Sequence, residues 1–261
     1  MVQESAPVLS DQEVSEVLSL IKGADSVELK LTVPDADHAS AVAALEMDVL
    51  DSQIRQIMFF DTPELALNTQ GVVVRARRVK GKPGDSVVKL RPIVPSDIPA
   101  KVRKSSGFGI EVDAMPGGFV CSGSMKAELD PVMVKEAFAG RRRIAKLFTK
   151  EQRGFYTDHA PEGIVLDDLS LLGPINVMKL KFTPGEFARR LVAELWFYPD
   201  GSRILELSTK CAPTEAFDVA AHAKAFLAGR GVDLAGEQQT KTKTALDFFA
   251  AELQAGAGQV S

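Results

Sequence analysis

Charged residues recur in pairs separated by one position, in a pattern that could bind phosphate or metal. Arg75 and Arg77 form one pair, and Lys89 and Arg91 form another in the next apolar segment. Side chains alternate between the faces of a β-strand, so the members of each pair share a face. Guanidinium and ammonium groups bind phosphate oxygens well. The pairs therefore indicate an anion-binding surface built on strands.

Carboxylates follow the same spacing on other segments. Glu111 and Asp113 form an acidic pair, and the segments "SVELKLTV" and "SRILELSTK" place Glu28 beside Lys30 and Glu206 beside Ser208 and Lys210. A solvent-exposed face of an antiparallel sheet would explain any one such strand. The sorting of cations and acids onto separate strands favours instead a site that binds a phosphate-rich ligand together with a divalent metal. Oxygen-only ligands favour magnesium or manganese over zinc.

The arrangement requires a sheet with a polar interior. If the strands carrying Arg75, Arg77, Lys89 and Arg91 pair as a hairpin, like charges crowd together, which costs stability unless an anion is bound. A closed or strongly curved sheet would hold a phosphate-rich ligand against these cations while the facing carboxylates hold metal.

Residue periodicity predicts the elements that position these side chains. Alternating polarity predicts strands at 27–33, 54–61, 71–79, 86–92, 108–114, 152–158, 163–172, 175–182, 191–198 and 202–210. Helical periodicity predicts helices at 10–23, 37–50, 130–148, 213–229 and 244–254, with loops at 80–85 and 115–118. We expect disordered tails at 1–9 and 255–261 around a single domain at 10–254.

Composition limits the classes of partner. The 261 residues are 45% hydrophobic and 25% charged, with a net charge of −4, so no global basic field of a nucleic-acid-binding protein is present. The sequence shows no long apolar run and no charged-then-apolar leader, so we expect neither a membrane span nor a signal peptide. Cys121 and Cys211 lie far apart without metal-ligand spacing, which favours a reducing, cytoplasmic location.

Several segments resemble one known family. "VELKLTV", "FFDTPELALNTQGVVVRARR", "VVKLRP", "EQRGFYTD", "VLDDLSLLG", "LELSTK" and "TKTK" are similar, in order and spacing, to the CYTH superfamily, also called the triphosphate tunnel metalloenzymes. Class IV adenylate cyclases, thiamine triphosphatases and inorganic triphosphatases belong to it. The resemblance covers roughly residues 26–246, and "FDTP" before the Arg-x-Arg strand is its most specific part. It implies an α+β fold: an antiparallel, closed or nearly closed β-barrel tunnel with a charged lumen and helices outside.

The resemblance also implies residue roles. The phosphate-binding side chains would be Lys30, Arg75, Arg77, Lys89, Arg91, Arg153, Lys210, Lys241 and Lys243, and the first three would also act in catalysis. The ligands of Mg²⁺ or Mn²⁺ would be Glu28, Glu111, Asp113 and Glu206.

The chain departs from the family pattern at two acids. The first strand of the family carries Glu-x-Glu-x-Lys, and Ser26 stands at the first glutamate. The late Glu-x-Glu strand is matched by Glu206 and Ser208, so a second acid is replaced by serine. We expect Ser26 and Ser208 to lie near one another, where a metal would bind.

The resemblance implies metal-dependent hydrolysis of a triphosphate-containing small molecule, such as inorganic, nucleoside or thiamine triphosphate. One alternative is a phosphate- or polyphosphate-binding module with little or no catalysis, motivated by the two serines. A second is adenylate cyclase, with a ribose hydroxyl as nucleophile, and a third is an unrelated β-sheet interaction protein. The expected partner is a small-molecule triphosphate or polyphosphate, without nucleic acid or membrane, and the expected state is a monomer or homodimer.

Overall fold

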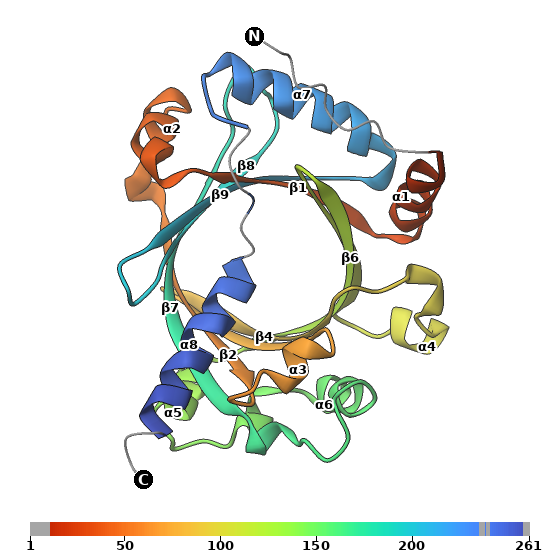
Figure 1. Cartoon of the computed structure of the whole chain (residues 1–261), viewed down its shortest axis with the longest axis vertical. Coiled ribbons are helices and arrows are strands. Elements are labelled where there is room, and N and C mark those ends of the chain that lie inside the picture. Colours follow the sequence, from red (N-terminus) through yellow and green to blue (C-terminus); the bar gives the residue numbers. More distant parts are fainter. Residues whose placement is uncertain (1–10, 235–237, 239–240, 258–261) are drawn as a thin grey trace.

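The computed structural model describes residues 11–234, 238 and 241–257. Within them, strands alternate with short helices around one closed barrel (Figure 1). The strands are β1 (Ser26–Val33), β2 (Gln53–Asp61), β3 (Val72–Val79), β4 (Lys82–Leu90), β5 (Phe108–Met115), β6 (Gly118–Leu129), β7 (Ser170–Phe182), β8 (Leu191–Phe197) and β9 (Arg203–Cys211). The predicted tail 1–9 lies outside the described residues.

The strand order is β1-β5-β6-β4-β3-β2-β7-β8-β9, and β9 pairs with β1 to close the barrel. The predicted α+β barrel is confirmed. The sheet is mixed, however, because β1 and β5 run parallel while the other pairs run antiparallel. This parallel pairing corrects the expected antiparallel barrel.

The helices are α1 (Asp11–Gly23), α2 (His38–Ala44), α3 (Ala66–Thr69), α4 (Ala100–Arg103), α5 (Pro131–Phe138), α6 (Lys150–Thr157), α7 (Ala216–Gly229) and α8 (Lys241–Ala257). Figure 1 shows α1, α2, α5, α6 and α7 around the outside of the barrel, while α8 lies across part of its opening. Among the described helices, none combines the length and apolar character needed to cross a membrane.

The two ends of the barrel differ. The end where β2 and β8 finish is crossed by α8, which we call the α8 mouth. Ala245, Leu246 and Phe249 of α8 pack there against lumen-facing side chains that include Phe59 and Trp196. At the other end, which we call the opposite mouth, β1, β2, β4, β5 and β8 begin and β3, β6, β7 and β9 end.

Apolar residues on the outer faces of the strands hold the helices. Val74, Ala76, Val88 and Leu90 are buried in one cluster with residues of α5 and α6, such as Phe155. Burial at about 25 cal/mol per Å² of apolar surface makes such clusters the main support of the barrel. Because these residues alternate with Arg75, Arg77 and Lys89 along the same strands, packing the outer face turns the charges inward.

Several predicted element boundaries are wrong. Residues 152–157 of the strand predicted at 152–158 form part of α6 instead, because Thr149 and Gln152 cap the helix reciprocally. The helix predicted at 130–148 ends at Phe138, and Gly140 follows with φ of 68°, a left-handed conformation that glycine adopts easily. Of the helix predicted at 37–50, only residues 38–44 form an α-helix, which is α2.

Other corrections concern strands. The segments 163–172 and 175–182 contribute to one strand, β7, and 163–169 precede it as an irregular segment with one helical turn. Strand β6 was not predicted, although outward Met125 and Leu129 alternate there with inward Ser124 and Lys126. The loop predicted at 80–85 contains the start of β4.

Candidate phosphate and metal site

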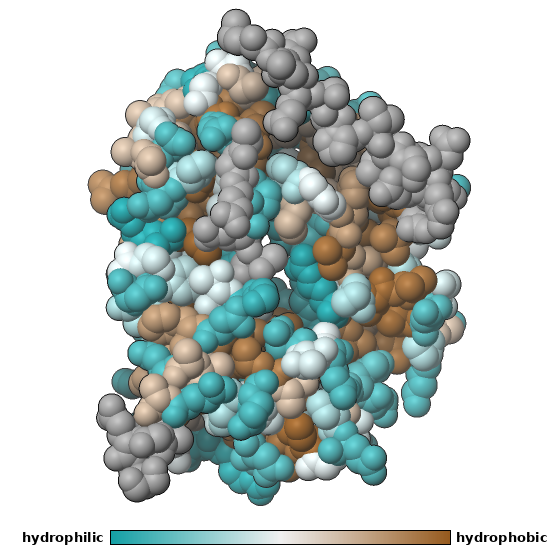
Figure 2. Space-filling view, viewed as in Figure 1, coloured by the Kyte–Doolittle hydropathy of each residue, from teal (hydrophilic) through white to brown (hydrophobic). Residues whose placement is uncertain are grey.

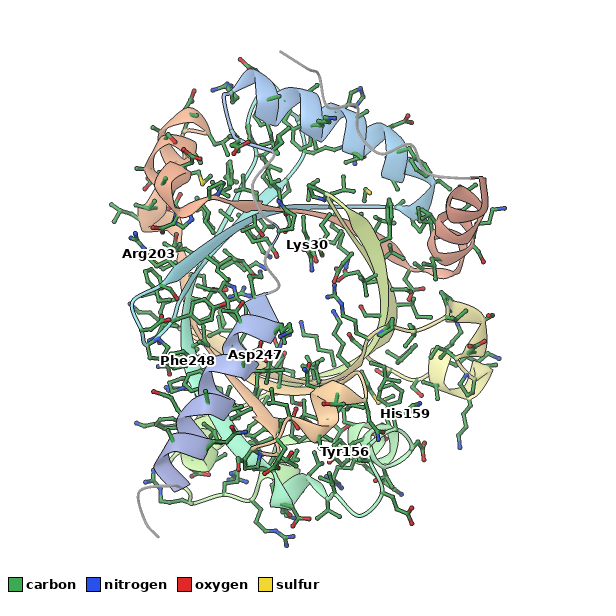
Figure 3. All side chains as sticks on the ribbon, in the orientation of Figure 1. Lys30, Tyr156, His159, Arg203, Asp247 and Phe248 are labelled. Carbon is green, nitrogen blue, oxygen red and sulfur yellow. The ribbon has the colours of Figure 1, made fainter. Side chains whose placement is uncertain are left out.

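The barrel brings five of the predicted cations into one lumen: Lys30, Arg75, Arg77, Lys89 and Arg91. Register shows this, since paired residues on neighbouring strands point the same way: Arg75 pairs with Val87, and Lys89 pairs with Ser124. Figure 3 shows Lys30 projecting from β1 into the interior. The lumen is therefore the place where these cations act together.

Asp85 is the acid nearest to one group of cations. Its Oδ2 accepts from Nε of Arg77 at 3.0 Å and lies 3.7 Å from Nζ of Lys126. Its Oδ1 lies 4.0 Å from the Arg75 guanidinium. Although burial raises the pKa of Asp85, Arg77 and Arg75 hold it below its ordinary value.

Arg75 lacks sufficient counter-charge. Among the described residues, its buried Nε has no hydrogen-bond partner. Burial, with repulsion from Arg77, lowers the pKa of Arg75 to about 10. Burial and Arg77 also lower the pKa of Arg55 on the neighbouring strand. A guanidinium in this condition is stabilised by an anion that enters the lumen.

A second group of cations surrounds Asp113, which is fully buried. Nζ of Lys30 lies 2.8 Å from Oδ1, and Arg91 donates to Oδ2 at 2.7 Å. Lys89 lies 3.8 Å from Oδ2. One acid thus serves three cations. Burial, aided by Lys30 and Arg91, lowers the pKa of Lys89 to about 8 despite the attraction of Asp113.

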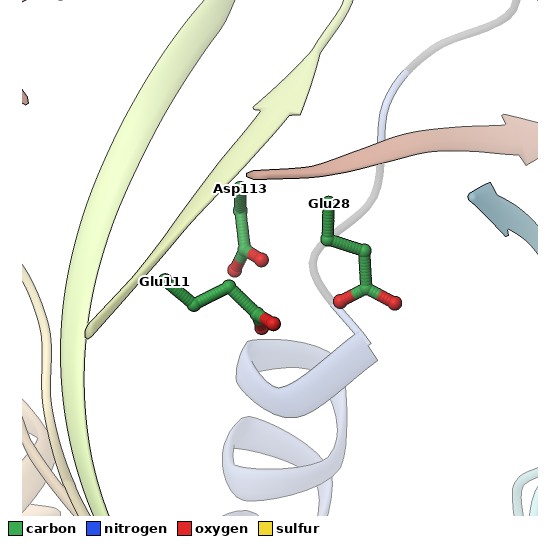
Figure 4. Close-up of side chains that lie close together, drawn as sticks. All are labelled: Glu28, Glu111 and Asp113. Atoms are coloured by element: carbon green, nitrogen blue, oxygen red, sulfur yellow. The ribbon is translucent and has the colours of Figure 1, made fainter. Parts of the chain in front are cut away.

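Three predicted metal ligands meet on the parallel strand pair. Glu28, Glu111 and Asp113 each offer a carboxylate oxygen, and these oxygens lie within 4.8 Å of one another (Figure 4). We call these three residues the acidic cluster. Register explains the meeting, since Glu28 pairs directly with Asp113 and Ser26 with Glu111. The cluster supplies the hard oxygen ligands that magnesium, manganese and calcium prefer, so it could bind a metal.

The acids of the cluster also have protein partners. Ser208 donates to Oε1 of Glu28 at 3.0 Å, and Ser26 donates to Oε2 of Glu111 at 3.4 Å. Lys30 lies 3.2 Å from Glu28, and Lys210 contacts Glu111. The two serines thus flank one cluster, although they reach different acids. A metal there would share the carboxylates with ammonium groups.

Glu206, the fourth predicted metal ligand, is not part of the acidic cluster. Its carboxylate lies 2.7 Å from Nζ of Lys241, the first residue of α8. The same Nζ lies 2.6 Å from Glu194 and 5.0 Å from the ring centroid of Trp196. Although burial opposes ionisation, Lys241 and Lys179 hold the pKa of Glu194 well below its ordinary value. Lys241 therefore joins α8 to the barrel wall.

The remaining predicted phosphate ligands lie elsewhere. Arg153 is exposed on α6, outside the barrel, and donates to the backbone of Phe148. Its predicted position on a lumen strand is wrong because residues 150–157 are helical. Lys243 is exposed and pairs with Asp247 along α8, pointing away from Lys241. Lys210 lies near the opposite mouth, with an exposed side chain.

Sequence reasoning missed Asp85, Arg55 and Lys126. Asp85 follows Pro83 and Gly84, which are typical of a loop. Gly84 allows this strand its close approach, since a Cβ there would lie 2.1 Å from the Arg77 carbonyl oxygen. The spacing of Asp85 from Val87 and Lys89 was the available signal, because it places the three on one face.

The lumen is filled unevenly. Phe59, Ile175 and Trp196 occupy the side of the lumen under α8. The rings of Phe59 and Trp196 are stacked, with their centroids 6.4 Å apart. On the β6 side the inward residues include Ser122 and Ser124, which are small. Figure 2, which looks at the α8 mouth, shows a hollow near the middle of the molecule with hydrophilic side chains beside it. The small serine side chains of β6 therefore leave space on the lumen side between Lys89, which pairs with Ser124, and Glu111, which pairs with Ser122.

Comparison with known proteins extends the description. No family model matches the chain, and no curated protein matches it in sequence. A solved structure from Hippeastrum, titled a "putative adenylyl cyclase" that reveals a dominant triphosphatase activity, aligns with a TM-score of 0.60 at 19% identity, covering 81% of this chain and 91% of its own. A "putative adenylate cyclase" from Bacillus halodurans aligns with a TM-score of 0.58 at 14% identity, covering 84% and 97%.

Both comparisons extend over most of each chain, so the likeness is one of the whole barrel rather than of a single motif. Identity below one fifth limits it to the fold. The predicted barrel fold is therefore shared with these two solved structures.

Proposed function

We propose that this protein hydrolyses a triphosphate-containing small molecule with a divalent metal in the barrel lumen. The observation that carries the proposal is the unbalanced charge of the lumen. Arg75 and Lys89 both have a lowered pKa, because each is buried among other cations. A triphosphate group would relieve this repulsion, and the same contacts would offset charge that develops in phosphoryl transfer.

In this proposal Arg75 and Arg77 hold one end of the phosphate chain, and Lys89, Arg91 and Lys30 hold the other. Asp85 and Asp113 fix the direction of these cations through their ion pairs. Such orientation before binding lowers the reorganisation needed in the transition state. The lumen also limits access of bulk water, which strengthens each charged contact.

Glu28, Glu111 and Asp113 would hold the metal, Mg²⁺ or Mn²⁺. When bound, it would polarise the phosphate and lower the pKa of a coordinated water. Glu206 is not proposed as a ligand of this ion, because Lys241 already neutralises it.

An adenylate cyclase uses the same phosphate contacts with a ribose hydroxyl as nucleophile. Both solved structures are described as putative adenylate cyclases, and the Hippeastrum protein is described as having a dominant triphosphatase activity. Those words concern the two relatives. For this chain they support phosphoryl chemistry in general and make cyclase the alternative reaction.

A second candidate function is phosphate binding without efficient catalysis. Its support is the pairing inside the acidic cluster, where Lys30, Ser26 and Ser208 contact the acids that would hold metal. Fewer free carboxylates weaken metal binding while the lumen cations keep their affinity for anions. A cytoplasmic location and a monomeric or dimeric state remain predictions.

Phosphate release from tripolyphosphate, ATP and thiamine triphosphate, each with and without Mg²⁺ or Mn²⁺, tests the proposal. We expect metal-stimulated release of inorganic phosphate from at least one of them. Release of pyrophosphate and cyclic AMP from ATP would identify a cyclase. Calorimetric binding of tripolyphosphate without turnover would favour the binding module.

Arg75→Ala tests the lumen itself, with Arg143→Ala as the matched control because Arg143 is exposed on the outer surface and pairs with Asp167. We expect Arg75→Ala to weaken tripolyphosphate binding by about 10- to 100-fold, as for loss of a charge-assisted contact. Equal binding by both variants would place the anion outside the lumen and overturn the proposal.

A further inference from the structure

The opposite mouth of the barrel carries exposed cations from separate hairpins. Lys82 begins β4, Lys181 lies at the end of β7, and Arg190 immediately precedes β8. Because these strand ends share one mouth, the three side chains border the same opening. All three residues are exposed, and none has an ion pair with an acid in the described part of the chain. We call Lys82, Lys181 and Arg190 the basic rim.

The other two rim cations lie close enough to Lys181 to affect its pKa. The pKa of Lys181 is lowered first by partial burial and then by Lys179, Arg55, Arg190 and Lys82. Repulsion of this kind requires that the charges lie close to one another across the mouth. The acids on neighbouring strand ends do not cancel it, since Glu111 is paired with Lys210. Other exposed acids border this end, including Asp25 before β1, Glu128 in β6 and Asp130 after β6, but in the described part of the chain none has an ion pair with a rim cation.

Further cations lead from the rim toward the lumen. Arg55 is 9% exposed, and its Nε has no hydrogen-bond partner among the described residues. It lines a cavity of about 640 Å³ at the edge of the barrel together with Arg78, Lys80 and Lys82, and outward-facing Gln56 is also part of the lining. On the inner side, Arg77 is the charge that most strongly affects the pKa of Arg55. Lys82, Arg55, Arg77 and Arg75 thus form a basic path from solvent to the lumen.

The α8 mouth is partly covered by α8, and the hollow seen in Figure 2 lies beside the part that α8 leaves open. Leu246 and Phe249 pack over its apolar side, and Lys241 is held between Glu194 and Glu206. The exposed cations nearby, Arg203 and Lys243, are each paired with an aspartate. Arg203 and Lys243 are therefore compensated, whereas, among the described residues, the cations of the basic rim are not.

We propose that the polyanionic ligand enters the barrel through the opposite mouth, and that the basic rim steers its approach. The inference rests on the proposed function, because it takes a triphosphate as the ligand. Clefts lined by charge of one sign raise association rates by about 10- to 1,000-fold, and salt weakens the effect. The rim cations border the opening without contacting the acidic cluster. Their removal is therefore expected to change the association rate more than the chemistry.

The test is the association rate constant of dye-labelled tripolyphosphate, measured by stopped-flow anisotropy. The rim variant is Lys82→Gln/Lys181→Gln/Arg190→Gln. The matched control, Lys101→Gln/Lys146→Gln/Lys224→Gln, removes the same charge from exposed positions away from the rim. We expect the rim variant to bind about tenfold more slowly than the parent in low salt, and the difference to vanish near ~0.5 M salt.

The control is expected to stay within about twofold of the parent. Lys82→Arg/Lys181→Arg/Arg190→Lys, which keeps the charge, should restore the rate and so separates steering from altered folding. Equal slowing in the rim variant and the control would overturn entry at this mouth while leaving the proposed function standing. A parent that binds no tripolyphosphate would overturn both.

Discussion

Arg91 donates to Asp113 at 2.7 Å from beyond the end of β4, although β6 lies between β4 and β5 in the sheet. The guanidinium therefore crosses one whole strand on the lumen side. Lys30 approaches the same carboxylate from β1 on the other flank. Asp113 thus holds cations from two strands in one place, and Lys89 is left as the least compensated of them.

Replacing Lys89 by methionine tests how much the crowding of cations lowers the stability of the protein, and how much Lys89 contributes to anion binding. The pKa of Lys89 is lowered to about 8 in the folded protein, so the unfolded chain binds more protons between that pH and the ordinary lysine value. Stability of the parent should therefore rise as pH increases through this window. Lys89→Met should add about 1–3 kcal/mol to the free energy of unfolding at pH 7 and should remove the rise.

Urea unfolding at pH 7 and pH 9.5 measures both effects, with exposed Lys135→Met as the control. Tripolyphosphate binding by the parent should weaken as pH rises through 8, because Lys89 loses its charge. The charges around Lys89 that act on its pKa are those of Asp113, Lys30, Arg91 and Glu111. A parent whose affinity does not change between pH 7 and 9 would contradict a role for Lys89.

Asp85→Asn tests whether an acid limits anion affinity on the other side of the lumen. The substitution leaves Arg75 and Arg77 without their counter-ion, so the free protein should lose about 2–4 kcal/mol of stability. Tripolyphosphate should bind about 3- to 10-fold more tightly, because less negative charge opposes it. Calorimetry and urea unfolding measure the two effects. Weaker binding would mean instead that Asp85 acts mainly by orienting Arg77.

Restoring two acids tests the metal proposal. Ser26→Glu/Ser208→Glu adds carboxylates beside Glu111 and Glu28, where the serine hydroxyls now donate. Mn²⁺ affinity, measured by electron paramagnetic resonance, should rise by about tenfold or more, since charge and ligand number set such affinities. Ser26→Gln/Ser208→Gln, similar in size and uncharged, is the control and should show no gain. An equal response in both variants would place the metal away from the acidic cluster.

Lys241→Met tests the attachment of α8. It leaves Glu194 and Glu206 buried without their shared ammonium group, which should cost about 3–5 kcal/mol of unfolding free energy. Lys243→Met, two residues later on the exposed face, should change stability by less than about 0.5 kcal/mol. Adding Glu194→Gln to Lys241→Met should recover part of the loss. No recovery would show that the packing of Lys241 on Trp196 matters more than its charge.

The inward-facing charged residues of the strands could be predicted from the sequence more reliably than the short helices between the strands. Alternation places Arg75, Arg77 and Lys89 inward because their neighbours are aliphatic and pack outward, and this follows from local pattern alone. Arg153 was misplaced because Phe155, Tyr156 and Thr157 are residue types that are typical of strands. The Thr149 cap and the burial of Gln152 against β4 and β6 decide for a helix there.

Contacts between segments that are far apart in the sequence could not be predicted from the local pattern of residues. Nothing near Glu206 indicates that Lys241 will neutralise it, since that pairing depends on how α8 crosses the barrel. The acidic cluster likewise depends on β1 pairing with β5 across about 80 residues of chain, which alternation cannot specify. The type of each site residue could be predicted, while its partner could not.

The parallel pairing of β1 and β5 has a topological origin. Around any closed ring in which neighbours always reverse direction, the number of strands must be even. The nine strands of the described barrel therefore require a seam where direction is kept. The acidic cluster lies on that seam, where Ser26, Glu28, Glu111 and Asp113 advance in step. Changing the strand count by one would remove the need for the seam, and with it the arrangement that brings these carboxylates together.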